Sequence, residues 1–389
     1  MQQHAITSID CGVFLLLLIP NLLRNVAFLE LTLFSAQCLP FLLLELPAKT
    51  AWHRVVRPHD EPFYDGLFQE VVFRCVKYCF RCMPCKFGRV FFSKEVAMPF
   101  WRYRFWAHER QTPFTWTEVN QESLRGLWMY KEEKEHHVIV YFVHGGGFSM
   151  GSPYFYLEFL LALLEALTDA GFANPAVFAI DYDLVPDSTY PTQTAQVLQG
   201  YRFVRERCLP ENIVLSGDSA GATLVLGLLF LMRHMGMQTS AAVGSAVLIS
   251  PWMTLRSPAF RDTATDILDK SSLERYGRQY IGGRREEKSD YIMNPGLCED
   301  KQVWMDILPK NGMDVVYGGE EVFAPDIERV VGMYGGSSIS LHREERQVHA
   351  WPVAMLFLGS NETQRTRGVQ LLAASIKRHQ AQDGKRPIV

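Results

Sequence analysis

From about residue 112 onward, short and long apolar segments alternate along the chain. The short ones, rich in β-branched and aromatic side chains, predict strands. Strands are expected at 115–120, 124–131, 138–143, 176–182, 212–217, 246–250, 313–318 and 338–344. Longer segments with helical spacing predict helices over 156–171, 194–207, 222–236 and 362–380. This alternation indicates an α/β fold with a mostly parallel eight-stranded sheet, helices on both faces and, because no helix separates the first two strands, an antiparallel start.

The pattern of apolar residues changes near residue 110, from helical spacing to alternating strand and helix segments. This change divides the chain into two parts. Residues 1–110 are expected to form an apolar helical cap or a membrane-associating segment, and 111–389 the α/β domain. Within that domain the stretch 253–312 is irregular, and we expect it to contribute to a lid.

The most apolar part of the N-terminal segment is 11–44, interrupted by Pro20, Arg24, Glu30 and Pro40. No run of about 18 residues there is free of charge, so a clean transmembrane helix is not established. The pattern fits one imperfect span, a pair of helices lying in the membrane interface, or apolar helices buried against the domain. We expect association with a membrane and keep the buried cap as the alternative.

Two short signals bear on the side of the membrane, and they disagree. The tripeptide 361–363 fits a glycosylation acceptor, which requires a lumenal domain, as in the endoplasmic reticulum. Lys49, Arg54 and Arg57 follow the apolar segment and favour a cytoplasmic domain. The sequence leaves this choice open.

Charge and cysteine content exclude some classes of function. The net charge of −3 is spread over 389 residues, without the basic face of a nucleic-acid-binding protein. Four of the eight cysteines, Cys75, Cys79, Cys82 and Cys85, crowd together. The first three share one helical face among arginines and lysines, which favours an amphipathic helix at the core or at a membrane over a metal site.

The sequence GDSAG, residues 217–221, lies between a predicted strand and a long predicted helix. A serine nucleophile stands on a sharp strand-to-helix turn, where a side chain two positions before or after it would clash. The helix that follows directs its first amides at developing negative charge. This arrangement predicts Ser219 as the nucleophile of an acyl transfer.

A second glycine-rich loop, His144-Gly145-Gly146-Gly147, follows the predicted strand 138–143. In an acyl-transfer enzyme of this architecture the oxyanion is held by the amide after the serine and by amides of such a loop. We therefore expect the oxyanion hole among Gly145, Gly146, Gly147 and Ala220, with no side chain filling the space of the oxyanion. His144 is expected to orient the loop.

The expected order along the chain is serine, acid, histidine. His349 lies on a loop after the last predicted strand, at the edge of the sheet where Ser219 also emerges, which favours it as the general base. The stretch after strand 313–318 offers Glu320, Glu321 and Asp326 as the acid.

Together these motifs resemble the hormone-sensitive-lipase-type branch of the α/β-hydrolase fold, which includes arylacetamide deacetylases and fungal steryl acetyl hydrolases. The matching pieces are HGGGF (144–148), DYDLVP (181–186), GDSAG (217–221), SPW (250–252), GGEEVF (318–323) and VHAW (348–351). The resemblance implies Ser219 as nucleophile, Glu321 as acid with Glu320 as competitor, and His349 as base. It also implies that residues 1–110 act as a lid or a membrane anchor. The chain departs from the family pattern at Asp183, usually arginine, at Glu321, usually aspartate, and at Ala350, usually glycine.

We therefore expect a serine carboxylic-ester hydrolase that needs no cofactor and no metal. Its substrate is expected to be a small hydrophobic ester, such as an acetylated sterol or fungal secondary metabolite. The expected pocket residues are Phe148, Tyr154, Trp252, Met253 and Trp351. The alternatives are an enzyme of acyl transfer or cyclisation, and a ligand-binding protein, on the same fold.

Overall fold

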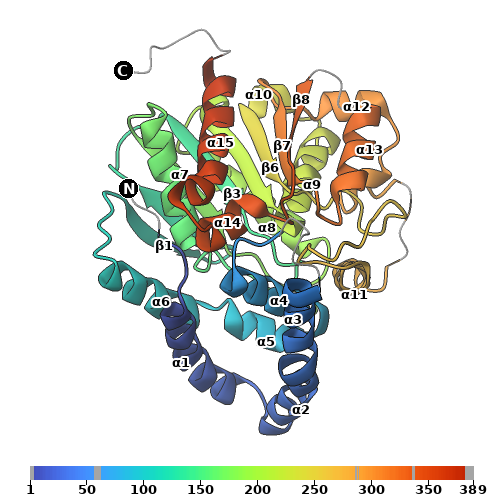
Figure 1. Cartoon of the computed structure of the whole chain (residues 1–389). Helices are drawn as coiled ribbons and strands as arrows, with labels where there is room; N and C mark the ends of the chain where they lie inside the picture. The colour runs from blue at the N-terminus through green and yellow to red at the C-terminus, as the bar shows by residue number, and fades with distance from the viewer. Residues whose placement is uncertain (1–3, 57–62, 285–286, 288, 335–337, 382–389) are drawn as a thin grey trace.

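The computed structural model describes residues 4–56, 63–284, 287, 289–334 and 338–381. Its centre is one eight-stranded sheet in the order β1-β2-β4-β3-β5-β6-β7-β8 (Figure 1). The strands are β1 (Thr115–Gln121), β2 (Leu124–Tyr130), β3 (Val138–Val143), β4 (Pro175–Ile180), β5 (Ile213–Asp218), β6 (Ser245–Ile249), β7 (Met313–Gly318) and β8 (Ile339–Glu344). All eight predicted strands are confirmed, within one or two residues at their ends.

The direction of the strands also follows the prediction. β2 pairs antiparallel with β1 and with β4, while every other neighbouring pair is parallel. Strands β3 to β7 are buried along their whole length, because helices cover both faces of this part of the sheet. The carboxyl ends of the parallel strands therefore meet at one edge.

Two groups of helices make these layers. On one face α7 (Leu157–Asp169) packs against α15 (Glu362–Ala381), which also contacts α14 (Trp351–Leu358). On the other face α8 (Thr192–Arg205) packs against α9 (Ala220–His234). The four predicted helices are confirmed. The pattern did not predict α14, the short α10 (Thr239–Ala242) or α13 (Ala324–Tyr334), which follows β7.

The stretch 253–312, expected to be irregular, contains α11 (Lys270–Ile281) and α12 (Lys301–Asp306). The sequence carries end signals for α11, because Asp269 caps its first turn and Gly282 adopts the left-handed conformation after it. Its buried face is Leu273, Tyr276 and Tyr280, at helical spacing. The helix was missed because polar residues dominate its other positions.

The N-terminal segment is helical and lies at one end of the molecule (Figure 1). Its helices are α1 (Ser8–Asn25), α2 (Phe28–Pro40), a π-helical turn (Phe41–Glu45), α3 (Leu46–Val56), α4 (Leu67–Cys82), α5 (Cys85–Phe91) and α6 (Lys94–Ala107). The stretches Ser8–Asn25 and Phe28–Trp52 are long and apolar enough to cross a membrane, and only 11% and 6% of them is buried. Most of the surface of these two stretches is therefore exposed, while Leu18, Phe14 and Phe34 pack on the hydrophobic core.

The cysteine cluster lies on α4 and at the start of α5. Cys75, Cys79, Cys82 and Cys85 are half-buried, and all eight cysteines of the chain are free thiols. Among the described residues, no group of three or more histidine, cysteine or acidic side chains is placed to hold a metal ion. The cluster belongs to the helical packing between α4 and its neighbours.

Candidate active site

Ser219 lies on a tight turn between β5 and α9. Its backbone has φ 53° and ψ −121°, a region that non-glycine residues rarely adopt. Side chains at Gly217 and Gly221 would each run into the carbonyl oxygen of Val143 on β3. The two glycines thus let β3 and α9 approach the turn, which is the reason that the motif predicted.

The loop after β3 shows which amides remain to bind an oxyanion. The amide of Gly145 donates to Asp218 Oδ1 at 2.8 Å, so it is already occupied. Asp218 Oδ2 accepts from the Tyr156 hydroxyl, also at 2.8 Å. The amides of Gly146 and Gly147 donate no hydrogen bond within the described part of the chain, and the amide of Ala220 starts α9. The candidates for the hole are therefore Gly146, Gly147 and Ala220.

Close packing against neighbouring protein atoms, rather than room for an oxyanion, explains why this loop contains glycines. A side chain at Gly145 would overlap Asp218, and one at Gly146 would overlap the carbonyl oxygen of Met150. At Gly147 it would lie 3.0 Å from the ring of Tyr276. Gly146 and Gly147 also have φ of 108° and 60°, which favour glycine. From the sequence we expected these glycines to leave space for the oxyanion of the substrate. In the structure a side chain at these positions would collide with neighbouring protein atoms.

Two buried groups support the loop. Asp218, which the motif contains but to which no role was assigned, links β5 to Gly145, and burial raises the pKa of its carboxyl to about 7. The ring of His144 stacks on the ring of Tyr182 at 4.3 Å, and the backbone carbonyl of His144 accepts a hydrogen bond from the Tyr182 hydroxyl. Burial lowers the pKa of His144 to about 4, so the imidazole is neutral near pH 7. These contacts hold His144 within the packing of the loop.

The acid and base candidates follow β7 and β8. The Glu321 carboxylate is fully buried, and its Oε2 accepts from Ser250 Oγ at 2.6 Å and from the Gly318 amide at 3.0 Å. The same oxygen lies 4.0 Å from Nδ1 of His349. The structure therefore brings Glu321 to His349. Glu320 instead makes backbone contacts, its amide to Gln347.

The distance of 4.0 Å exceeds a hydrogen bond, so this pair is close but not engaged. Catalytic hydrogen bonds are often long without substrate and shorten when it binds. Burial raises the pKa of Glu321 well above its usual value and lowers the pKa of His349 to about 3, so it favours the neutral form of both groups. A neutral imidazole is the form that a general base requires.

Two further residues, which sequence reasoning missed, hold the acid and base loops together. Asp266 is fully buried and accepts from the amides of His349 (2.8 Å), Val322 (2.9 Å) and Ile267 (2.9 Å). Burial raises its pKa to about 6. Ser250 donates to Glu321 and accepts from the amide after His349 at 2.9 Å. Ser250 lies in the SPW motif, but Asp266 lies in the irregular stretch, where no motif marked it.

The predicted pocket residues are all buried, and the structure separates them. Phe148 stacks on Tyr280 at 3.8 Å, with Trp252 5.5 Å away. Trp252 stacks on Phe323, whose ring meets the edge of the His349 ring at 5.1 Å. This aromatic cluster lies beside the base candidate.

The other three lie elsewhere in the packing. The carbonyl of Tyr154 accepts from Trp101 on α6, and that of Met253 accepts from the Gly296 amide. Trp351 begins α14 and is buried there. Tyr154 therefore belongs to the contact with the N-terminal helices.

The centre is closed to solvent. Ser219 is 6% exposed, Ala220 is buried, and His349 is 4% exposed. A polar cavity of about 390 Å³ lies near Arg125 and Asp181, and one of about 230 Å³ lies between Tyr64 and Val348. Neither of these two cavities is lined by Ser219 or His349.

Comparison with known proteins follows this geometry. The sequence model of one family, described as steryl acetyl hydrolase, matches residues 74–350, which include the serine turn, the glycine loop and the histidine. The protein belongs to the steryl acetyl hydrolase family. The apolar helices α1 to α3 precede the matched segment.

Relatives of this steryl acetyl hydrolase family member are hydrolases. A putative steryl acetyl hydrolase of Schizosaccharomyces pombe is 25% identical over 69% of this chain and 75% of its own. An acetyl-hydrolase of Streptomyces hygroscopicus is 34% identical over 40% of this chain, and the match spans half of that relative. Among solved structures, a fungal esterase from Rhizomucor miehei has a TM-score of 0.64 at 19% identity, covering 83% of this chain and 98% of its own. A hormone-sensitive-lipase homologue from a metagenome library has a TM-score of 0.61 at 16% identity, covering 80% and 98%. The α/β-hydrolase fold is confirmed.

Replacing Asp266 with asparagine tests whether Asp266 positions the loops that carry Glu321 and His349. An amide side chain has one acceptor oxygen and cannot receive the three amides that the carboxylate holds. A misplacement of about 1 Å costs roughly 10²-fold in rate, so we expect kcat to fall about 10²-fold with a smaller change in KM. Steady-state hydrolysis of p-nitrophenyl acetate checks this.

The matched control is Asp262→Asn, because Asp262 lies in the same segment, is exposed and accepts from the Lys270 amide. It should leave kcat and KM unchanged. A kcat of Asp266→Asn equal to that of the control would show that Asp266 does not position the site.

Proposed function

We propose that the protein is a serine carboxylic-ester hydrolase that acts on a hydrophobic ester through an acyl-enzyme. The observation that carries the proposal is the backbone of Ser219, held at φ 53° between β5 and α9. His349 and Glu321 follow β8 and β7 at the same edge of the sheet, 4.0 Å from one another. Membership in the family agrees with this chemistry.

The proposed reaction has two halves. Ser219 Oγ attacks the ester carbonyl while His349 takes the hydroxyl proton, and Glu321 stabilises the charged imidazole. The amides of Gly146, Gly147 and Ala220 hold the oxyanion. His349 returns the proton to the departing alcohol, and the acyl group stays on Ser219. His349 then takes a proton from water, the hydroxide attacks the acyl-enzyme, and the acid leaves as Ser219 regains its proton.

The substrate class follows from the surroundings of the base. The Phe323 ring contacts His349, and the rings of Trp252 and Phe148 continue this apolar wall away from the base. A short acyl group on a bulky apolar alcohol, such as an acetylated sterol, fits this wall. The names of the relatives from Schizosaccharomyces pombe and Streptomyces hygroscopicus support an acetyl group.

Hydrolysis of p-nitrophenyl esters of rising acyl length tests the proposal. We expect the highest kcat/KM with the acetate and a steady fall with longer chains, because the closed site resists extra methylenes. A fluorophosphonate probe should label the active protein and block this activity. Folded protein that neither hydrolyses an ester nor reacts with the probe would contradict the proposed function and favour a binding role.

A further inference from the structure

The outward faces of α1 and of the stretch from α2 to α3 are apolar and exposed. We call residues 8–52 the apolar hairpin. Nine of its large side chains have between 56% and 78% of their surface exposed: Ile9, Leu16, Leu23, Phe28, Leu29, Leu33, Leu43, Leu44 and Trp52. An exposed apolar face of this extent marks a site of contact.

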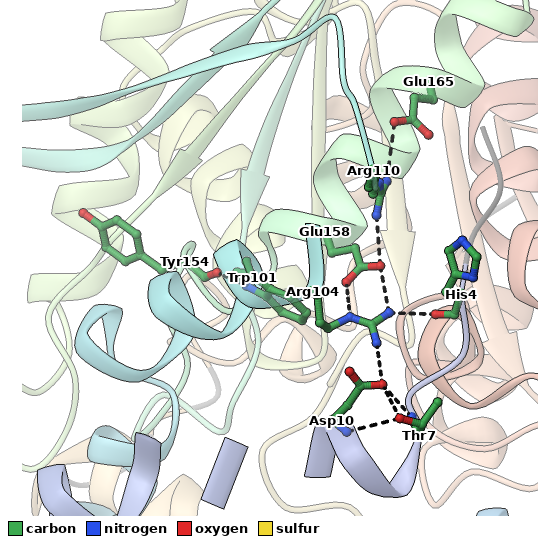
Figure 2. Close-up of polar contacts among 9 residues, drawn as sticks. All are labelled: His4, Thr7, Asp10, Trp101, Arg104, Arg110, Tyr154, Glu158 and Glu165. Carbon is green, nitrogen blue, oxygen red and sulfur yellow. Dashed lines mark hydrogen bonds and ion pairs between the residues drawn. The ribbon is translucent and has the colours of Figure 1, made fainter. Parts of the chain in front are cut away.

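The start of the hairpin is fastened to the catalytic domain by a buried network of charges (Figure 2). Arg104 on α6 is only 1% exposed, and its guanidinium donates to both oxygens of Glu158 on α7, at 3.0 and 3.2 Å. It also donates to Asp10 on α1 at 3.0 Å and to the carbonyl of His4 at 2.8 Å. One buried cation thus joins the N-terminus, α6 and α7.

The network continues on both sides of Arg104. Arg110 lies 2.9 Å from Glu158 and 3.4 Å from Glu165, both on α7. Asp10 and Thr7 cap the first turn of α1 through reciprocal hydrogen bonds. The amide of Ile6 donates to the Phe357 carbonyl on α14 at 2.8 Å. Because removing one partner from such a buried set is strongly unfavourable, residues 4–10 stay with the catalytic domain.

The second helix of the hairpin, α2, also contacts the rest of the protein. Glu30 pairs with Lys86 at 3.0 Å, and the Phe34 ring lies 4.7 Å from the Phe87 ring. Further along, the Tyr78 hydroxyl donates to a carbonyl of α2, and Phe41 stacks on Tyr78 at 4.0 Å. α2 therefore contacts α4 and α5 at three points, at Glu30, Phe34 and Gln37, while its other side is exposed.

These contacts restrict how the protein meets a membrane. A single span would carry residues 4–10 to the far side, away from Glu158 and Arg104. Two full spans would pull α2 away from Lys86 and Phe87. We propose that the apolar hairpin inserts its outer face into one leaflet of a lipid bilayer, in the plane of the membrane, and keeps the N-terminus and the catalytic domain on the same side.

A bilayer suits this face better than another protein. Both stretches of the hairpin meet the length and composition of membrane-embedded helices. The stretch ends with exposed Lys49, Trp52 and Arg54, the aromatic and cationic side chains typical of the headgroup region.

Vesicle flotation tests the contact with lipid. The purified full chain should float with vesicles of phosphatidylcholine containing phosphatidylserine. Replacing Leu16, Leu43 and Leu44 with serine should lower the bound fraction more than about tenfold, because each leucine contributes apolar burial. The control Leu209→Ser changes an exposed leucine of the catalytic domain and should bind like wild type.

Equal binding of the triple variant and wild type would overturn the proposal. Hydrolysis of soluble p-nitrophenyl acetate by all three proteins separates this result from failure of the proposed function.

Protease protection in sealed microsomes tests the topology. One tag precedes residue 1, a second follows residue 389, and a third is inserted between Val26 and Ala27, where α1 turns into α2. We expect all three tags to be cleaved together or protected together. Termini on opposite sides would show a single span, and a tip on the side opposite to both termini would show two spans. Either result would overturn the proposal.

Discussion

Replacing Ser219 with alanine is expected to lower kcat for p-nitrophenyl acetate by about 10⁶-fold, the scale found when a serine nucleophile is removed. No acyl-enzyme can form without the hydroxyl, and His349 then has no alcohol to activate. The fold should survive, because Ser219 makes its hydrogen bonds to Ile249, Trp252 and Thr223 through its backbone. Hydrolysis rates and labelling by a fluorophosphonate probe measure the effect.

The matched control for this variant is Ser216→Ala. Ser216 lies on the same strand, three residues before the nucleophile, and its hydroxyl donates to the Val247 carbonyl at 2.7 Å. Its loss removes one buried hydrogen bond, at about 1 kcal/mol of stability, and should leave the rate unchanged. If Ser219→Ala hydrolyses the ester as fast as this control, Ser219 is not the nucleophile.

Replacing Arg104 with leucine is expected to lower the free energy of unfolding by about 3–5 kcal/mol. The change leaves Asp10 and Glu158 as buried carboxylates without their central cation and frees the carbonyl of His4. The first turn of α1 should then detach from α6 and α7. Urea denaturation gives the free energy, and proteolysis near the N-terminus reports the detachment.

The neighbouring Arg102→Leu provides the comparison, because it removes the same charge from an exposed position of α6. Surface changes of this kind usually stay within about 0.5 kcal/mol. Equal stability of the two variants would mean that the buried network does not fasten the hairpin, and the topology inferred from it would lose its support.

The helix α4 lies between the apolar hairpin and the candidate active site. Lys77 donates to the carbonyl of Thr263, whose hydroxyl donates to the Glu320 carbonyl at 2.7 Å. Tyr276, the neighbour of Gly147, donates to the carbonyl of Phe80 at 2.7 Å. Both loops that carry the candidate chemistry therefore contact the layer on which the apolar hairpin rests.

The sequence alone determined the elements whose signals are local. Short β-branched segments marked all eight strands, and glycines around Ser219 marked the serine turn, because both depend on neighbours within a few residues. The sequence also limited the acid to Glu320, Glu321 or Asp326. It could not choose by geometry, since adjacent residues differ only in the direction that the folded loop gives them.

Only the tertiary structure decided the features that depend on distant partners. It showed that the Gly145 amide donates a hydrogen bond to Asp218. It also showed that the His349 amide donates to Asp266, which lies in a stretch without a motif. It also separated an exposed apolar hairpin from a buried cap, which hydropathy cannot do. A run of leucines indicates only that the segment avoids water. The ion pairs of Arg104 with Asp10 and Glu158 fix where the start of the segment lies in the fold.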